Sequence, residues 1–98
     1  MDDFKVEDFE FNINPDAPLF VISVVSDMVR IPIWTLRRLD EMGVVSAERQ
    51  GKKTRCYSKH QIKKLIYIRY LMEDKGVNIS GIKFILTNEQ HRKGADND

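Results

Sequence analysis

The stretch WTLRRLDEMG, residues 34–43, decides the fold of this 98-residue chain. At 100° per residue, a helix over this stretch places Leu36 and Leu39 on one face and Trp34, Arg37, Arg38 and Glu41 on the other. A tryptophan that points away from the core exposes apolar area unless a partner covers it, and arginine pairs well with flat-edged anionic groups. Duplex DNA is therefore the leading candidate partner. The alternative is that a neighbouring loop covers Trp34 while the arginines are solvated.

Residues before this stretch complete a predicted helix-turn-helix. We expect a short strand over Leu19–Ile22, with Ser23 as the N-cap of a short helix over Val24–Met28. The second helix is expected over Pro32–Met42, because proline at a helix start has no amide hydrogen to leave unbonded. Gly43 is the expected C-terminal stop. Two short helices joined by a tight turn form a helix-turn-helix.

A basic hairpin is predicted next. Val44–Gln50 and Thr54–Tyr57 read as extended segments around a loop of Gly51, Lys52 and Lys53. A hairpin directly after a helix-turn-helix is a wing.

Two further helices follow the wing. Ser58 and Gln61 match a capping box, and Asn78 is the expected cap of the last helix, which should fray from Thr87 onward. The apolar side of this helix pair is expected to be core: Ile62, Leu65, Ile66, Ile68, Leu71, Met72, Ile79, Ile82, Ile85 and Leu86. The predicted fold class is mainly α with a small β wing, a winged helix-turn-helix followed by a helix pair.

Composition narrows the class of protein. The chain is 42% hydrophobic and 32% charged, which is typical of one small globular domain. We find no apolar run of membrane-spanning length and no signal peptide. The single cysteine, Cys56, has no other cysteine or histidine at a spacing typical of metal ligands. We therefore expect a cytoplasmic protein at the nucleoid. No nucleophile, metal or phosphate-loop motif is present, so we expect no enzyme activity, cofactor or metal.

The net charge of +1 hides a strong asymmetry. Residues 1–19 hold six acidic residues against Lys5, a net charge of −5, so the remainder carries +6. Residues 49–64 hold seven basic residues and no acidic one. A basic domain behind an acidic segment is a common arrangement in nucleic-acid binders, although such a run can also be a solvated surface.

The motif order resembles the MerR-type family of bacterial transcription regulators. The resemblance lies in TLRRLDEMGVV over residues 35–45, Arg49, Gly51 and the RCY of residues 55–57. FVISV at 20–24 and DKGVNISGIK at 74–83 are similar to the heat-shock repressor branch, HspR. The resemblance implies an acidic, disordered tail over residues 1–18, a DNA-binding domain over 19–86 and a polar tail over 87–98.

Several positions depart from the family pattern. Arg30 stands where the turn usually has glycine, and Arg38 and Leu39 stand where aromatic residues are frequent. Family members usually continue into a long helix that pairs antiparallel across a two-fold axis. This sequence reaches Asp98 through a polar segment, so we expect that helix to be absent or cut off.

The expected DNA contacts lie on the second helix and the wing. Arg37 can bond guanine O6 and N7 or clamp a phosphate, Trp34 and Ile33 can meet a thymine methyl or the sugar-phosphate edge, and Arg38 suits a phosphate. Thr35 and Tyr57 fit either DNA contact or packing. The full set of candidates is Ile33, Trp34, Thr35, Arg37, Arg38, Arg49, Lys52, Lys53, Arg55 and Tyr57.

Three functions remain open at this point. The first is a sequence-specific regulator of double-stranded DNA, a repressor of heat-shock or stress genes by resemblance, acting as a homodimer on DNA. The second is an architectural or excisionase-like winged protein. The third is an interaction module whose acidic segment and Trp34 contact a chaperone or polymerase.

Overall fold

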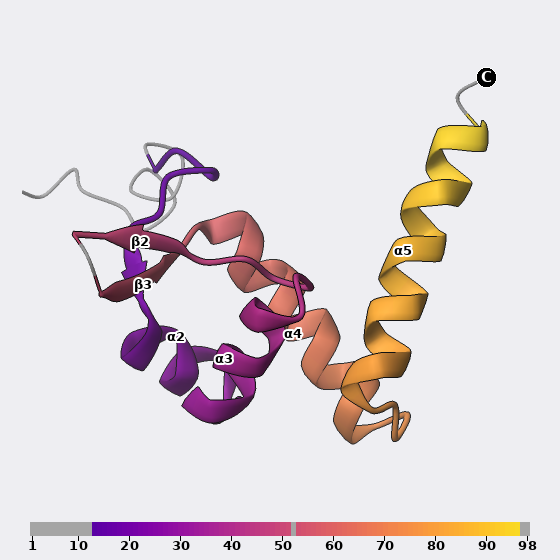
Figure 1. The fold of residues 1–98 in the computed structure, drawn as a ribbon, viewed down its shortest axis with the longest axis horizontal. Coiled ribbons are helices and arrows are strands. Elements are labelled where there is room, and N and C mark those ends of the chain that lie inside the picture. Colours follow the sequence, from indigo (N-terminus) through magenta and orange to yellow (C-terminus); the bar gives the residue numbers. More distant parts are fainter. Residues whose placement is uncertain (1–12, 52, 97–98) are drawn as a thin grey trace, which may run out of the picture.

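A computed structural model describes residues 13–51 and 53–96 of the chain (Figure 1). The elements in chain order are β1 (Phe20–Val21), α2 (Ile22–Val29), α3 (Ile33–Glu41), β2 (Glu48–Gln50), β3 (Thr54–Tyr57), α4 (Lys59–Glu73) and α5 (Ile79–Asp96). The predicted fold class is confirmed: a winged helix-turn-helix is followed by a helix pair.

The sheet has three antiparallel strands in the order β1-β3-β2. The predicted hairpin is present, with Arg49 paired to Arg55, and β1 adds to the other edge of β3 by pairing Val21 with Cys56. The hairpin's first strand is shorter than predicted. Val44 and Val45 are buried in the turn after α3 instead of extending β2.

The start of α2 differs from the prediction. The helix begins at Ile22 and its N-cap is Val21, whose side chain makes no capping hydrogen bond, so Ser23 as N-cap was wrong. Val21 already has extended backbone angles in β1, and the chain turns into the helix directly behind it.

The ends of α3 follow local backbone chemistry. Pro32 precedes the helix as its N-cap, and Gly43 follows it with a φ of +73°, a left-handed conformation that favours glycine. The Val44 amide donates to the Leu39 carbonyl and the Gly43 amide to the Asp40 carbonyl, which is the Schellman pattern. The predicted stop at Gly43 is confirmed.

The start of α4 is a complete capping box, as predicted. The Gln61 amide donates to the Ser58 hydroxyl at 3.1 Å, and the Ser58 amide donates to the Gln61 side-chain oxygen at 2.9 Å. Both bonds satisfy amides that have no partner within the helix.

The last helix is longer than predicted. The Asn78 side chain accepts from the Gly81 amide at 2.8 Å, Ile82 is fully buried, and the helix runs to Asp96 instead of fraying from Thr87. Once a first turn is fixed, each added residue contributes one further hydrogen bond, so polar residues can extend it. The Tyr67 hydroxyl also bonds the Glu89 carboxylate at 3.0 Å.

The core lies where α2, α3, α4 and the sheet meet, and α5 reaches it through its first turns (Figure 1). Ile66, predicted as core, is 56% exposed because it lies on the outer side of α4. The buried apolar residues are Val25, Val29, Ile31, Leu36, Leu39, Val44, Val45, Cys56, Tyr57, Ile62, Leu65, Ile68, Leu71 and Ile82.

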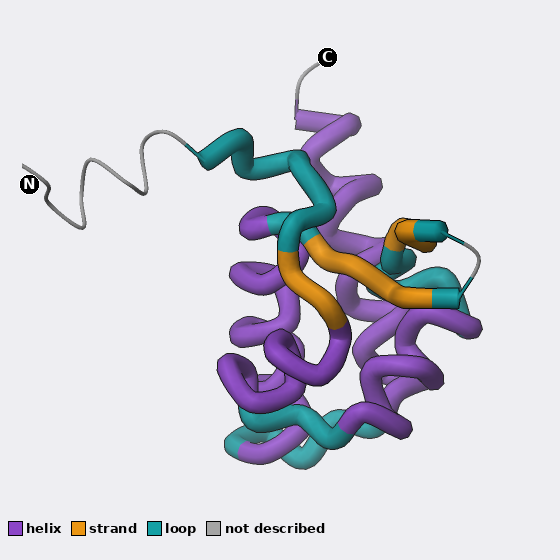
Figure 2. Tube along the Cα trace, turned by 90° about the vertical axis from the view of Figure 1, so that its left-hand side faces the viewer, coloured by secondary structure: helices purple, strands orange, loops and turns teal. Residues whose placement is uncertain are grey.

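Part of the predicted N-terminal tail lies against the domain. The His60 amide donates to the Pro15 carbonyl at 3.0 Å, and the His60 imidazole contacts the Asp16 carboxylate at 2.8 Å. Residues 13–19 lie beyond the strands from α2 and α3 in both views (Figures 1 and 2). Residues 13–18 of the predicted tail therefore include contacts with α4, whereas residues 1–12 lie outside the described part of the chain, and the boundary at residue 18 stays a prediction.

Candidate nucleic-acid interface

The outer face of α3 carries an exposed tryptophan between two exposed arginines. Trp34 is 70% exposed, Arg37 and Arg38 are exposed, and Leu36 and Leu39 on the opposite face are fully buried. Among the described residues, none of the three outer side chains has a hydrogen bond, ion pair or ring contact. The two predicted faces are confirmed. The alternative in which a neighbouring loop covers Trp34 is wrong.

The turn before α3 sets the position of this face. Arg30 has φ 58° and ψ 42°, the left-handed conformation that a glycine adopts without strain. The Ser26 hydroxyl donates to the Ile31 carbonyl at 2.6 Å across the turn. Because Ile31 is itself buried, α3 leaves the turn in a fixed direction.

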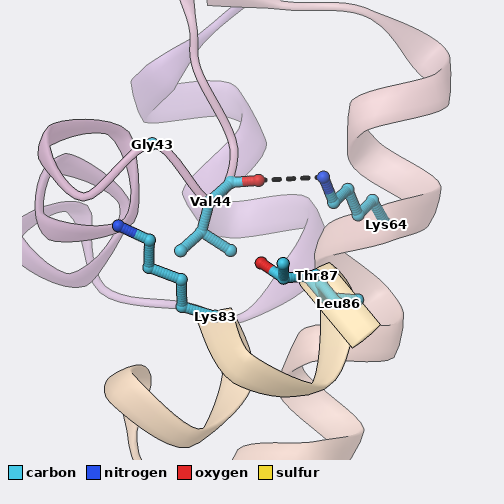
Figure 3. A pocket seen from close by; sticks show the side chains of 6 residues that line it. All are labelled: Gly43, Val44, Lys64, Lys83, Leu86 and Thr87. Carbon is cyan, nitrogen blue, oxygen red and sulfur yellow. Dashed lines mark hydrogen bonds between the residues drawn. The ribbon is translucent and has the colours of Figure 1, made fainter. Parts of the chain in front are cut away.

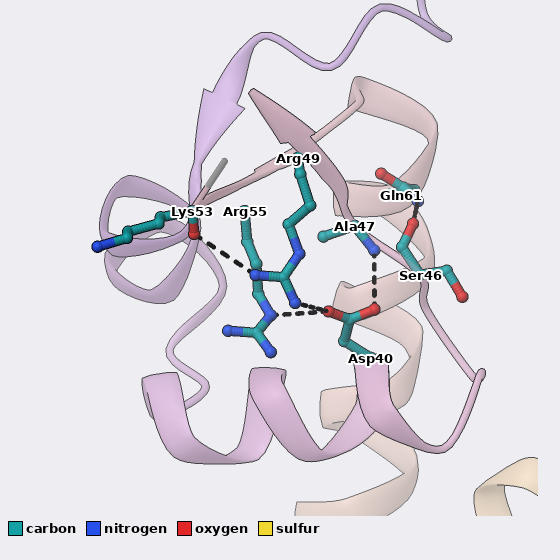
Figure 4. A network of polar contacts seen from close by, with 7 residues as sticks. All are labelled: Asp40, Ser46, Ala47, Arg49, Lys53, Arg55 and Gln61. Carbon is teal, nitrogen blue, oxygen red and sulfur yellow. Dashed lines mark hydrogen bonds and ion pairs between the residues drawn. The ribbon is translucent and has the colours of Figure 1, made fainter. Parts of the chain in front are cut away.

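Asp40 joins α3 to the wing (Figure 4). Its carboxylate accepts from Arg55 Nε at 2.7 Å and from the Ala47 amide at 3.3 Å, and Arg49 Nη2 lies 3.7 Å away. The Asp40 and Arg55 side chains are only 13% and 16% exposed. A largely buried ion pair therefore fixes the wing against the C-terminal end of α3.

The other described cations of the wing are more exposed than Arg55. Arg49 is 46% exposed and donates through Nη1 to the Lys53 carbonyl at 3.4 Å, while the Lys53 side chain is exposed. Lys52 lies outside the described residues, so its contact with DNA stays a prediction. At the other end of β2, Gln61 Nε2 donates to the Ser46 carbonyl at 2.6 Å, which holds the wing to α4.

Two of the candidate contacts are core residues. Thr35 is 2% exposed and Tyr57 is fully buried, so the structure favours the packing alternative over direct DNA contact for both side chains. Thr35 lies on the inward side of α3 beside Leu36. Burial and the nearby Asp40 raise the pKa of Tyr57 to about 12.

Arg55 and Asp40 take roles that the sequence did not predict. Arg55 was a candidate phosphate contact, yet its guanidinium is held by Asp40 and acts as a positioning group for the wing. The only sequence signal for Asp40 was that it is an acidic residue between Arg38 and Gly43 in the motif of residues 35–45 that resembles the family. Its partner lies 15 residues away, so only the folded chain shows the pair.

A small pocket lies near this framework. Gly43, Val44, Lys64, Lys83, Leu86 and Thr87 line a cavity of about 80 Å³ (Figure 3). Lys64 Nζ donates to the Val44 carbonyl at 2.9 Å, and Lys83 extends toward Gly43. The two lysines lie near the carbonyl end of α3, where cations stabilise a helix, and the space is below that of a typical small-molecule site.

The described residues were also compared with the patterns of metal sites and membrane-spanning helices. Within residues 13–51 and 53–96, no three His, Cys, Asp or Glu side chains gather as metal ligands, and Cys56 is a buried core residue. A search of the same ranges finds no helix with the length and apolar character needed to cross a bilayer.

Comparison with known proteins agrees with this geometry. A family model described as MerR HTH family regulatory protein matches residues 20–89. The chain is similar to a Streptomyces coelicolor protein that bears the name heat shock protein HspR, at 35% identity over 79 residues, 81% of this chain and 52% of that protein. It is also similar to the HTH-type transcriptional regulator GlnR of Bacillus anthracis and of Bacillus cereus. Each match has 33% identity over 79 residues and covers 60% of GlnR. The chain thus spans about half to three fifths of these relatives and belongs to the MerR family of helix-turn-helix regulatory proteins.

Proposed function

We propose that this chain is a transcription regulator that binds double-stranded DNA, with α3 in the major groove and the wing against the adjacent backbone. The observation that carries the proposal is the exposed face of Trp34, Arg37 and Arg38, which has no partner within residues 13–51 and 53–96, on a helix whose other face is buried. A rigid helix with cations aimed outward is the shape that a major groove admits.

Each outward group has a chemical counterpart on DNA. The Arg37 guanidinium matches the paired acceptors of guanine, and the Trp34 indole and part of Ile33 suit a thymine methyl or a sugar edge. Arg38, Arg49 and Lys53 suit phosphates, which fix register without reading sequence. The Asp40–Arg55 pair supports this docking, because it holds the wing and α3 as one surface.

Selection of bound duplexes from a random pool tests the proposal. We expect one enriched motif, and we expect Arg37→Ala to relax preference at one position by about 1–3 kcal/mol. Lys53→Ala should weaken binding to all sequences equally. Lys75→Ala, which removes one charge near the Tyr70 ring on α4, is the matched control and should bind like the parent. No enrichment, or equal loss in the control, contradicts the docking mode.

A repressor of heat-shock or stress genes is the finer proposal. It is supported by the similarity to the protein named heat shock protein HspR. Transcription in vitro from a promoter that carries the selected motif should fall when the protein is added. A rise in transcript would make the chain an activator.

A homodimer on DNA is the proposed state. Helix α5 supports it because its Phe84 side chain is 68% exposed, a large apolar group that a second copy could cover. The mass of the protein–DNA complex in solution should correspond to two chains on a palindrome, and Phe84→Asp should halve that number. An extended footprint without a palindrome would favour the architectural alternative. Contact with a chaperone or polymerase stays a prediction.

A further inference from the structure

The outer face of α3 is poorly suited to bare water. Trp34 is 70% exposed. Arg37 and Arg38 lie three and four residues further along the helix, so both are neighbours of the indole in the next turn. Among the described residues, no carboxylate pairs with either arginine. This surface, hereafter the α3 face, offers one aromatic anchor and two free cations.

The first twelve residues of the chain have the complementary chemistry. They hold five acidic residues against Lys5, a net charge of −4, and three phenylalanines at positions 4, 9 and 11. Carboxylates suit arginine and aromatic rings suit an exposed indole, so one short segment carries both kinds of partner.

The segment is long enough to meet the α3 face. It joins the domain at Ile13, beyond the strands from α2 and α3 (Figures 1 and 2). Twelve extended residues span at most about 40 Å, whereas the molecule measures 46 × 36 × 29 Å along its axes. This reach is comparable to the dimensions of the whole molecule, so its length allows contact between the segment and α3.

We propose that residues 1–12 dock on the α3 face of their own chain, with phenylalanine against Trp34 and carboxylates against Arg37 and Arg38. The occupant is this segment and not a second protein, because charge and apolar complementarity lie in one chain and its attachment raises the effective concentration. Where α3 is the DNA-binding helix, as in the proposed function, the segment competes with DNA.

Trp34 supplies a direct test that needs no DNA, since it is the only tryptophan in the chain. Quenching of its fluorescence by acrylamide, a neutral quencher, reports access to the indole independently of charge. Deletion of residues 2–12 should increase the quenching constant by about twofold, provided that the docked state holds at least half of the molecules. High salt should produce the same increase in the full chain but not in the deletion variant, because screening weakens ion pairs.

Two further variants separate the components of the contact. Replacement of the five acidic residues by their amides removes the charge, and replacement of the three phenylalanines by alanine removes the apolar part; each should raise quenching. Asp74→Asn, an exposed acid at the end of α4, is the matched control and should leave quenching unchanged. A synthetic peptide of residues 1–12 should protect Trp34 in the deletion variant.

The outcomes distinguish this inference from the proposed function. Equal quenching in the full chain and the deletion variant, with both folded by circular dichroism, overturns the docking. Increased quenching together with a gain of about twofold in affinity for the selected duplex, the factor expected when half of the molecules are docked, supports docking and competition. Increased quenching with unchanged DNA affinity supports docking and overturns the competition with DNA.

Discussion

Arg30 stands where the family usually has glycine, and the structure shows that its backbone is strained. Its backbone is left-handed, a conformation that costs a residue with a side chain about 1–2 kcal/mol relative to glycine. The family usually has glycine at this turn, and the Arg30 side chain is exposed, so the substitution is tolerated without a gain in core packing.

Arg30→Gly should therefore stabilise the domain. The expected increase in the free energy of unfolding is about 0.5–1 kcal/mol, because relief of strain exceeds the added freedom of the unfolded chain. Denaturant unfolding measures it. Arg30→Ala keeps the strain and should show no such increase, and a stabler alanine variant would contradict the explanation.

Tyr57 gives a second prediction at this scale. Its hydroxyl is buried and has no partner among the described residues, so Tyr57→Phe should not lower stability at neutral pH and should leave DNA affinity unchanged.

The raised pKa of Tyr57, about 12 against 10, also sets an alkaline effect. Because the pKa of Tyr57 is higher in the folded than in the unfolded chain, its contribution to the free energy of unfolding is fully present below pH 10. This contribution, about 2–3 kcal/mol, is lost as the pH rises toward 12. Unfolding curves between pH 9 and 12 should show the parent losing more stability than Tyr57→Phe. Parallel losses would contradict this role for the phenol.

At the scale of elements, α3 and the wing form one unit through Asp40. The carboxylate reaches Arg55 on β3 and the Ala47 amide before β2, so it bridges both arms of the hairpin. The capping box at Ser58 and the Gln61 bond to Ser46 hold the other end of the wing on α4. The surface that we propose to face DNA is therefore positioned by polar contacts between elements.

A double-mutant cycle on Asp40→Asn and Arg55→Gln tests this link. Each single change should lower the free energy of unfolding by about 1–3 kcal/mol, because it leaves a largely buried charge unpaired. The coupling energy should be about 1–3 kcal/mol. The exposed Arg69–Glu73 pair is the matched control, with an expected coupling below about 0.5 kcal/mol. Equal coupling in the two pairs would show that Asp40 does not anchor the wing.

At the scale of the whole molecule, the separation of charge matters more than the net value of +1. Acidic residues gather before residue 17 and basic residues on α3, the wing and the start of α4. Contacts from Arg37, Arg38, Arg49 and the two wing lysines would release condensed counterions from DNA.

Binding should therefore depend steeply on salt despite the small net charge. Four to five phosphate contacts predict a slope of about −4 in log affinity against log salt, a loss of about 10²-fold between 50 and 200 mM salt. Titrations of the selected duplex by fluorescence anisotropy measure it. A slope near zero would contradict a phosphate-binding surface of this size.

Local signals in the sequence determined the helices, the hairpin, the Gly43 stop and the capping box at Ser58, as well as the two faces of α3. These features depend on residues within one or two turns of each other, so they can be predicted from the sequence without knowledge of the tertiary structure. Only the tertiary structure decided that β1 pairs with β3, that Asp40 holds Arg55, and that Thr35 and Tyr57 belong to the core. Those outcomes depend on groups far apart in sequence, and burial and ion pairing between such groups arise only when the elements pack.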